Sequence, residues 1–259
     1  MDPIKAFREQ VAANIKALGE NDRALTLSRQ WSEVTNADGY TYNFTWLGRP
    51  VIQYPQDLVA MQELIWSVRP DLIIETGIAH GGSLVFSASL LAQLDLADAI
   101  DAKKSINPAE SSRRVLGVDI DIRAHNRRAI ESHPMASRIQ MIQGSSIEDS
   151  VVSQVHDIAS QFDRVMVVLD SNHTHEHVLA ELEAYAHLAS VGSYCVVFDT
   201  LVEDMPAEMF LNRPWGPGNN PKTAVWEFLQ SHPEFEIDSS IHDKLLITVA
   251  PDGYLRRVR

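Results

Sequence analysis

Few cysteines, a shortage of basic residues and no long apolar run limit what this 259-residue chain can be. Cys195 is the one cysteine, which excludes an internal disulfide framework, and its place in the apolar run YCVVF predicts a buried, unreactive thiol. Lysine and arginine number 22 against 35 acidic residues, and the resulting net charge of -13 argues against a nucleic-acid partner. No stretch approaches 18 apolar residues, and the charged N-terminal segment does not resemble a signal peptide. We therefore expect a cytoplasmic protein without membrane insertion.

What is present is the composition of a folded globular chain, with 45% hydrophobic and 22% charged residues. An apolar stripe predicts a helix over residues 3–18. Residues 31–56 mix aromatic, glycine and polar residues, which favours an irregular cap or lid. We therefore divide the chain into an N-terminal helix and cap, residues 1–56, and a main domain, residues 57–259, that opens with a helix over 57–68.

Short apolar runs then alternate with helical patterns along the main domain. The runs lie at residues 72–74, 115–118, 139–142, 165–169 and 194–198. Strands that alternate with helices are typical of βαβ units and of a parallel sheet covered on both faces. The clearest crossover helix spans residues 175–189, where the apolar stripe is followed by a glycine. The sequence thus predicts a doubly wound α/β fold.

Two segments depart from this alternation. The tail FEIDSSIHDKLLITVAPDGYLRRV predicts two closely spaced strands with a PDG turn beyond them, which indicates an antiparallel edge. Residues 93–114 are polar and long for a connection, so we interpret them as a surface insertion.

The first strand ends in IIETGIAHGGS, with Glu75 at its end and then Gly77, Gly81, Gly82 and Ser83. Glycines permit close backbone approach to a ligand, and such a βα turn is where open α/β sheets bind ligands. The spacing matches neither the dinucleotide motif nor a phosphate loop. It suits a nucleoside that carries an amino acid, whose ammonium group Glu75 would contact directly or through water. A tight turn without a ligand is the alternative.

The next two strands end in residues that suit the rest of a nucleoside. Asp119 follows the second strand, where an acidic residue commonly accepts hydrogen bonds from ribose hydroxyls. Ser145 and Ser146 follow the third strand and could bond an adenine edge, with Ile147 packed on the ring. A simple helix cap is the alternative for this serine pair, and the two roles are compatible.

The fourth and fifth strands end in carboxylates. Asp170 could bind a hard divalent cation, and His173, three residues later, could take a proton from a hydroxyl. Asp199 ends the neighbouring strand, about 5 Å away in a parallel sheet, so both carboxylates could share one ion. Capping of a loop is the alternative for Asp199. The HTHEH run lacks the further ligands of a zinc site, so we expect His175 and His177 at the exposed start of a helix.

Taken together, the motifs ETGIAHGGS, GVDID, GSS, LDSNHTH, FDT and RPWGPGNNP resemble the cephalosporin hydroxylase / rhamnosyl O-methyltransferase family over roughly residues 54–257. The resemblance implies a Rossmann-like, mostly parallel seven-stranded sheet with an antiparallel edge and an N-terminal helical cap. It also implies S-adenosylmethionine as the methyl donor. The residues expected to hold this donor are Glu75, Gly77, Gly81, Gly82, Ser83, Asp119, Ser145, Ser146 and Asp170.

The same family resembles metal-dependent O-methyltransferases, in which a strand-end Asp binds Mg²⁺ and a base stands three residues later. Asp170 and His173 match these places, which makes His173 the expected catalytic base. The acidic pair expected after the next strand reads Phe198–Asp199, so an apolar ring replaces one ligand. The expected Mg²⁺ ligands are therefore Asp170 and Asp199. The residues that could compensate for the missing ligand are Thr200, Glu203 and Asp204; otherwise the metal is weakly held or absent.

The RPWGPGNNP loop completes the prediction. Trp215 either stacks on a sugar or anchors the loop, while Asn219, Asn220 and Lys222 could bond a polyhydroxylated acceptor. We predict an enzyme that forms a homo-oligomer and methylates a hydroxyl of a sugar or other small molecule. The alternatives are an accessory protein that binds S-adenosylmethionine without methyl transfer and a nicotinamide-dependent oxidoreductase, against which the glycine spacing argues.

Overall fold

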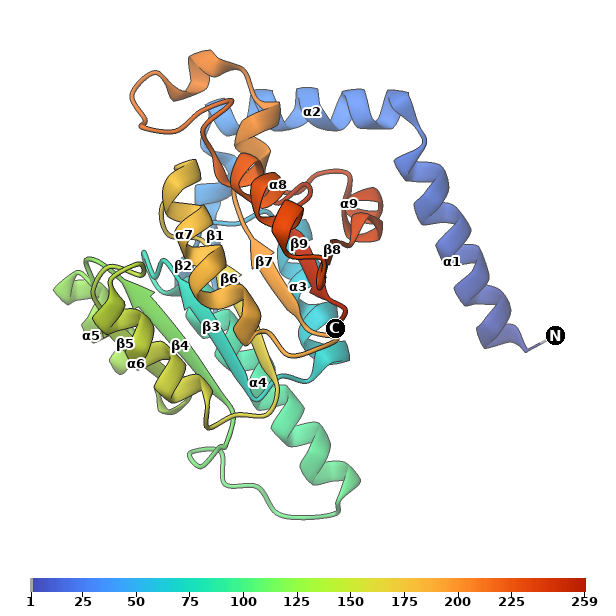
Figure 1. The fold of residues 1–259 in the computed structure, drawn as a ribbon. Helices are drawn as coiled ribbons and strands as arrows, with labels where there is room; N and C mark the ends of the chain where they lie inside the picture. The colour runs from blue at the N-terminus through green and yellow to red at the C-terminus, as the bar shows by residue number, and fades with distance from the viewer. Residues whose placement is uncertain (1) are drawn as a thin grey trace.

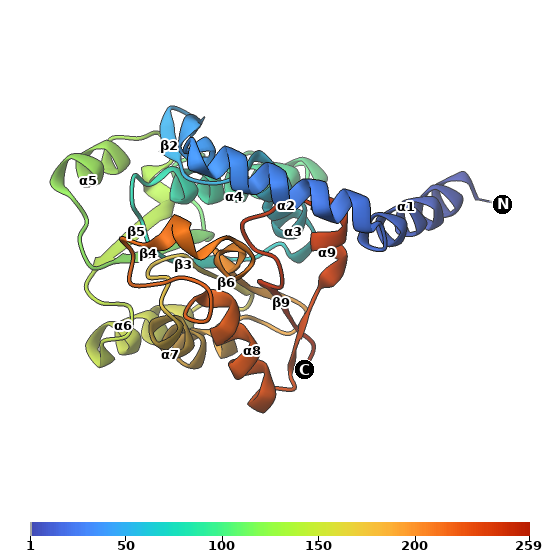
Figure 2. The same ribbon diagram turned by 90° about the horizontal axis from the view of Figure 1, so that it is seen from above.

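The computed structural model describes residues 2–259 and has one central sheet between two layers of helices (Figures 1 and 2). The strand order is β5-β4-β3-β6-β7-β9-β8. The strands are β3 (Leu72–Thr76), β4 (Arg114–Asp119), β5 (Ile139–Gln143), β6 (Val165–Leu169), β7 (Tyr194–Val197), β8 (Phe235–Ile237) and β9 (Tyr254–Arg257). The first five are parallel, and β9 pairs antiparallel with both β7 and β8. The predicted seven-stranded fold with an antiparallel edge is confirmed.

Alternate residues of the strands build the two cores. On β3, Ile73 packs into one core and Leu72 and Ile74 into the other, because successive strand side chains point to opposite faces. The first core is covered by α3 (Pro55–Val68), α4 (Gly82–Asp101), α5 (Ala124–Glu131) and α9 (Ser239–Leu245). The second is covered by α6 (Asp149–Ala159), α7 (His175–Tyr185) and α8 (Pro221–Ser231). Burial on both faces explains why the strands read as unbroken runs of valine, isoleucine and leucine.

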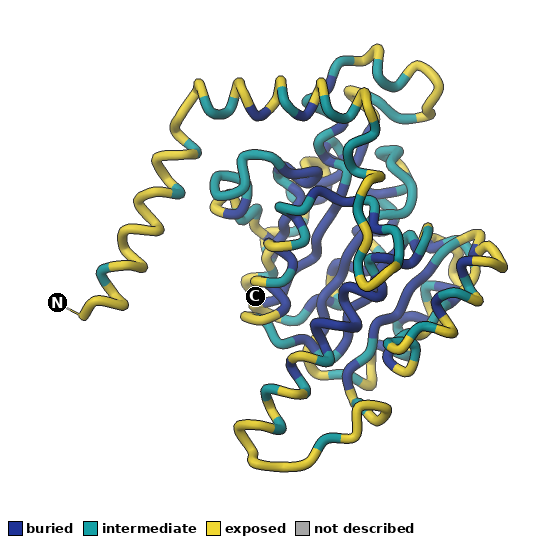
Figure 3. Tube along the Cα trace, turned by 180° about the vertical axis from the view of Figure 1, so that it is seen from behind, coloured by how far each residue is buried: buried dark blue, intermediate teal, exposed yellow. Residues whose placement is uncertain are grey.

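The N-terminal segment is more regular than the sequence predicted. α1 (Pro3–Gly19) is confirmed, but α2 (Asp22–Ala37) and a hairpin of β1 (Phe44–Trp46) and β2 (Arg49–Val51) replace most of the expected irregular cap. The apolar stripe of α1, which includes Ile4 and Phe7, is exposed, and α1 projects from the body with contacts to α2 and α9 (Figures 1 and 3). The apolar stripe therefore predicts the helix correctly, but it does not predict that the helix is buried.

Two expectations about the main domain need correction. Residues 93–114 are not wholly an insertion, because α4 runs on to Asp101, and buried Arg113 ties the following loop back to Asp98 at 2.8 Å and to Asp95. In the tail, residues 239–245 form α9, and the second edge strand, β9, comes after the PDG turn. Five 3₁₀ helices complete the described chain, at Tyr40–Asn43, Ala136–Arg138, Ala186–Leu188, Thr200–Asp204 and Ala207–Phe210.

By length and composition alone, helix α4 could also be a membrane span. It is long enough for a membrane span, and an 18-residue window of it has a mean hydropathy of 1.4. Half of that window is buried, and the buried side chains, among them Leu84 and Leu91, pack in the first core. Packing against the sheet accounts for its apolar composition.

The parallel strands reverse their order of addition between β3 and β6, and ligands of doubly wound folds bind at such a point. The backbones are close there. Gly77 has a φ of 90°, and a Cβ on it would lie 2.0 Å from the Asp170 carbonyl oxygen. Gly82 begins α4, and a Cβ on it would lie 2.1 Å from the Pro50 carbonyl oxygen. Both positions therefore require glycine.

Candidate active site

A cavity of about 460 Å³ opens at the carboxyl ends of the strands, at the point where the order reverses. Its walls come from the glycine turn 77–83, from the ends of β6 and β7, and from two flanking segments, 36–53 and 205–215. Residues 36–53 of the N-terminal segment thus form one wall of the cavity, and much of this wall has regular structure.

Asp119 shapes the glycine turn. Its Oδ2 accepts hydrogen bonds from the backbone amides of Ile78 at 2.8 Å and Ala79 at 3.2 Å, and its Oδ1 accepts one from Asp121 N at 2.9 Å. A carboxylate has about four acceptor positions, so capacity for a ribose hydroxyl remains. The predicted ribose ligand is therefore also the residue that fixes the turn.

Glu75 lies beneath the same turn and is only 3% exposed. Ser83 Oγ, which lines the cavity, donates a hydrogen bond to Glu75 Oε1. Burial raises the pKa of Glu75 to about 7, because the charged form loses its hydration. Ser83 thus stands between Glu75 and the cavity, which favours an indirect contact to a ligand over a direct one.

Ser146, after β5, belongs to a hydrogen-bond network with residues of α7 that the sequence did not suggest. Ser146 is buried, and its Oγ lies 3.0 Å from His177 Nε2. Ser171, which lines the cavity, donates to Glu181 Oε1 at 2.6 Å and lies 3.3 Å from the same imidazole nitrogen. Glu181 is fully buried in α7. Ser145 is partly exposed beside this network.

The expectation that His175 and His177 are exposed is therefore wrong. His177 joins Ser146 to Glu181, as described above. His175 joins α7 to α8, with Nδ1 2.8 Å from Thr223 Oγ1 and Nε2 3.1 Å from Glu227. His175 therefore faces the neighbouring helix α8, whereas His177 faces the loops that carry Ser146 and Ser171.

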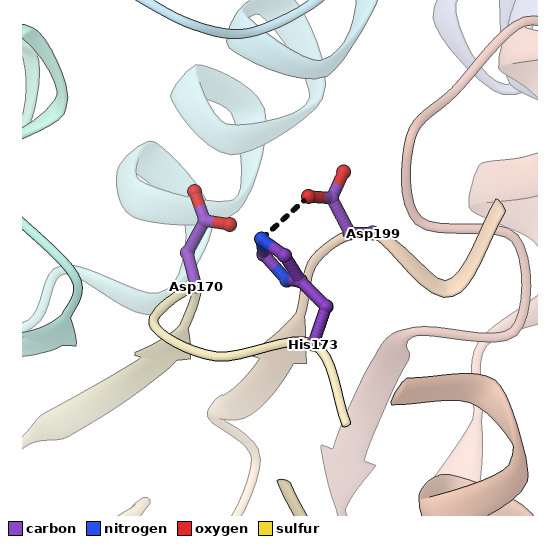
Figure 4. Close-up of side chains that lie close together, drawn as sticks. All are labelled: Asp170, His173 and Asp199. Atoms are coloured by element: carbon purple, nitrogen blue, oxygen red, sulfur yellow. Dashed lines mark ion pairs between the residues drawn. The ribbon is translucent and has the colours of Figure 1, made fainter. Parts of the chain in front are cut away.

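The structure brings Asp170, His173 and Asp199 together, and their side chains point toward one another in Figure 4. One potential ligand atom from each lies within 4.8 Å of the others, and no other such group of three occurs among residues 2–259. His173 Nε2 is 3.1 Å from Asp199 Oδ2. Burial, and then the charge of Asp199, raise the pKa of Asp170 well above its ordinary value. Gln53 Nε2 donates to Asp170 at 3.2 Å, which only partly offsets that charge.

None of the three residues expected to compensate for Phe198 reaches this group. Phe198 itself is 5% exposed and packs in the first core. Thr200 donates to the Pro251 carbonyl at 2.5 Å, Glu203 accepts from Gly218 N at 2.7 Å, and Asp204 pairs with Lys222 at 2.7 Å. The third potential ligand is instead the imidazole of His173, from the loop after β6 that also carries Asp170.

The loop after β7 divides between lining the cavity and structural bonding. Trp215 lines the cavity, and its ring meets the His173 ring edge-on at 4.8 Å. Asn219 accepts from His175 N at 2.9 Å and donates to the Pro214 carbonyl, and buried Asn220 caps α8. Neither amide is among the residues that line the cavity, and Lys222 is used in its ion pair with Asp204. Their side chains therefore hold the loop in place.

Sequence reasoning missed the residues that clamp the glycine turn from outside. Arg49, on the β1–β2 hairpin, donates to the His80 carbonyl at 3.1 Å and to Asn126 Oδ1, and Asn126 donates to the Ala79 carbonyl at 2.8 Å. These partners lie up to 77 positions apart in the chain. Their only sequence signal was polarity within segments that otherwise looked irregular or amphipathic.

Asp57 was also missed, since it was read only as the start of a helix. It is fully buried and accepts hydrogen bonds from Val249 N at 2.9 Å, Tyr254 Oη at 2.8 Å and the Thr248 hydroxyl. Burial raises its pKa to about 6. Val249 lines the cavity and accepts the backbone bond of Leu201, so Asp57 supports the turn that carries Asp199.

A doubly wound seven-stranded sheet with an antiparallel edge, a glycine turn after its first strand and carboxylates at the order reversal defines the class I methyltransferase architecture. The sequence profile of the family described as "Rhamnosyl O-methyltransferase/CmcI" matches residues 38–258. The chain belongs to this family, which confirms the resemblance read from its motifs and the prediction of an O-methyltransferase.

Individual relatives agree with the family. The chain is 26% identical over 215 residues to the rhamnosyl O-methyltransferase of Mycobacterium tuberculosis, covering 82% of this chain and 78% of that protein. It is 26% identical to the enzyme of the same name from Mycobacterium leprae, covering 82% of each. Among solved structures, CmcI described as "D160 Mg-SAM" superposes with a TM-score of 0.55 at 17% identity, covering 84% of this chain and 78% of that one. The CmcI "N160 apo-structure" gives 0.54 at 17% identity, covering 84% and 77%. At this identity the two structures confirm the fold.

Proposed function

We propose that this enzyme moves a methyl group from S-adenosylmethionine to a hydroxyl of a sugar or a similar small molecule, with the help of a divalent metal. The observation that carries the proposal is the grouping of Asp170, His173 and Asp199 beside the glycine turn. The relatives named rhamnosyl O-methyltransferase support a sugar acceptor, and the CmcI structure with Mg and SAM supports the donor and the metal.

The donor would lie over the carboxyl ends of β3, β4 and β5. Gly77 and Gly82, which line the cavity, would allow its close approach, and Gly81 would complete the turn between them. Ser83, backed by Glu75, faces the cavity. Asp119 would accept from the ribose hydroxyls. Ser145 and Ser146 would contact the adenine edge, and the hydroxyl of Ser146 is oriented by His177. In this arrangement the methyl group would point toward Asp170 and the part of the cavity lined by residues 205–215.

His173 would take the proton that the acceptor hydroxyl loses as the new C–O bond forms and the C–S bond breaks. Asp199 Oδ2 lies 3.1 Å from its Nε2, so the carboxylate fixes the ring and stabilises the imidazolium that results. The Trp215 ring packed edge-on against the imidazole limits its rotation. A base held in this way contributes typically 10²–10⁴-fold to a rate.

The same three side chains also fit a divalent cation. Two carboxylates and one imidazole suit Mg²⁺ or a softer ion such as Mn²⁺, and Asp170 lies in a position where its negative charge is poorly compensated. A bound cation would act as a Lewis acid on the acceptor oxygen. Asp170 and Asp199 would hold it, and His173 would serve either as a third ligand or as the base.

Chelation distinguishes these arrangements. We expect EDTA to lower methyl transfer to sugar acceptors and added Mg²⁺ to restore it, with the protein still able to bind S-adenosylmethionine in a calorimeter. As a readout apart from activity, Mg²⁺ titration should change the fluorescence of Trp215, and Trp215→Phe is the matched control. Full activity after exhaustive chelation would leave the His173–Asp199 pair as the catalytic unit. Donor binding without transfer to any sugar would favour the accessory-protein alternative.

We also propose an oligomeric state, a range of partners and a location for the enzyme. The exposed apolar stripe of α1 supports a homo-oligomer, and the net charge of -13 supports the absence of a nucleic-acid partner. We expect a cytoplasmic protein without membrane insertion. Light scattering of the purified protein would measure its oligomeric state. The division of the chain at residue 56 into a cap and a main domain stays a prediction.

A further inference from the structure

We infer, resting on the proposed methyl transfer, that the acceptor carries an anionic group, a phosphate or a carboxylate, that Arg213 binds while the hydroxyl to be methylated lies beside His173. The inference starts from an arginine that the proposed reaction does not use. Arg213 lines the cavity in the loop before α8.

The guanidinium of Arg213 is free to bind a ligand. It lies over the Trp215 ring, 5.2 Å from the centroid, and its side chain makes no ion pair or hydrogen bond with the described residues 2–259. The cavity-lining residues include no other lysine or arginine. By contrast, Arg113 and Arg49 are both engaged by protein oxygens. A cation held by an aromatic face and left without an anion is a typical anion-binding element.

Arg213 and His173 both lie close to Trp215. The centroid of the Trp215 ring is 4.8 Å from the centroid of the His173 ring and 5.2 Å from the guanidinium carbon of Arg213. The guanidinium therefore lies no more than roughly 10 Å from the imidazole. An acceptor with its hydroxyl beside His173 and its anionic group at Arg213 would therefore need to span no more than this distance.

Charge gives Arg213 a role in selecting the substrate. Asp170 and Asp199 face the same cavity in a chain of net charge -13, and Arg213 is the one lysine or arginine among the lining residues that counters this negative charge. Arginine presents paired donors that match a phosphate or carboxylate, which a neutral sugar cannot exploit. Arg213 thus selects charged acceptors over neutral ones.

The test compares three acceptors that differ in charge: a hexose, its 1-phosphate and the corresponding uronic acid. Binding is followed by calorimetry with S-adenosylhomocysteine present, and methyl transfer is followed separately. We expect the wild type to prefer at least one anionic sugar, and Arg213→Gln to weaken that binding roughly ten- to hundredfold, since hydrogen bonds to charged groups are worth about 1.5–3 kcal/mol. Arg213→Lys should restore part of it. Arg8→Gln, on exposed α1, is the matched control and should behave as the wild type.

The outcomes separate the inference from the proposed function. Preference for the phosphate or for the uronic acid identifies which anion is bound. Equal binding of neutral and anionic sugars, or a preference that survives Arg213→Gln, would overturn the inference even if a sugar is methylated. Binding that depends on Arg213 without any methyl transfer would support the inference and count against the proposed reaction. Failure of both anionic sugars to bind would also overturn it.

Discussion

The half of the cavity that we propose holds the methyl donor and the half that we propose holds the acceptor are built in different ways. In the donor half, the glycine turn is fixed by backbone bonds to Asp119 and by the clamp of Arg49 and Asn126. In the acceptor half, an irregular loop presents long side chains, among them Arg213 and Trp215, around the acidic group. A half built from backbone bonds holds one constant geometry, whereas a half built from loop side chains can change its ligand by substitution. The difference suits an enzyme with a fixed donor and a variable acceptor.

The largest effect should come from the acceptor half. His173→Ala should lower kcat by about 10²–10⁴-fold, because the proton would have no acceptor at the reacting oxygen. The affinity for S-adenosylmethionine should stay nearly constant, since the imidazole contacts Asp199 and Trp215 and not the glycine turn. Single-turnover kinetics and calorimetry measure the two quantities.

His125, exposed on α5, provides the control, because His125→Ala removes the same group far from the cavity. The distinction between the halves would break if His173→Ala weakened donor binding as much as it slowed transfer. If the His173→Ala variant were as active as the wild type, His173 would not be the catalytic base.

The second effect concerns the folding of the donor half. Because burial raises the pKa of Glu75 to about 7, the folded chain holds a proton there that the unfolded chain releases near pH 4.5. The stability from this proton is fully present below pH 4.5 and is lost as pH rises to 7, for a total of about 3 kcal/mol.

Urea unfolding without ligand, measured from pH 4.5 to 8, should therefore show a fall in stability with pH that Glu75→Gln makes smaller. Part of the fall should remain, because burial also raises the pKa values of Asp57 and Asp170. Glu110→Gln, at an exposed loop position, should keep the wild-type profile. A profile unchanged by Glu75→Gln would mean that the carboxyl finds water or a partner that the fold does not show.

The smallest of the three effects should come from Asp119. Asp119→Ala should weaken S-adenosylmethionine binding roughly ten- to hundredfold, since it removes a charged acceptor worth about 1.5–3 kcal/mol. At saturating donor, kcat should remain close to that of the wild type. Calorimetry and saturation kinetics measure the two, with the exposed Asp121→Ala as control. Unchanged affinity in a folded variant would refute the ribose contact.

What could be predicted from the sequence follows the same division. The five parallel strands and the positions of Asp119, Asp170 and Asp199 at their ends were predicted correctly, because buried strands and the turns after them are local patterns. The edge strand β9 was misplaced, since the apolar run LLITV looks like a strand in isolation but packs as the end of α9 and a loop. Local pattern alone does not decide between two ways of burying the same side chains.

The remaining parts of the site depend on contacts between distant segments. Gln53 reaches Asp170 across 117 positions, and Asp57 reaches Val249 across 192. Glu203 and Asp204 were plausible metal ligands by sequence position, yet Glu203 bonds to the loop before α8 and Asp204 pairs with Lys222 in α8. Such choices are made by tertiary packing, which a single sequence does not display.

Because the chain has a single cysteine, the reactivity of its thiol can report local opening of the central sheet. Cys195 lies in β7 with no exposed surface, and burial raises the pKa of its thiol, so it should be silent toward thiol reagents while the sheet is closed. Labelling then requires β7 to separate from β6 or β9. The labelling rate of the unmodified protein would thus measure the free energy of opening at the centre of the sheet, four residues before Asp199, and its slowing by ligands would show how tightly each half of the cavity holds the strands together.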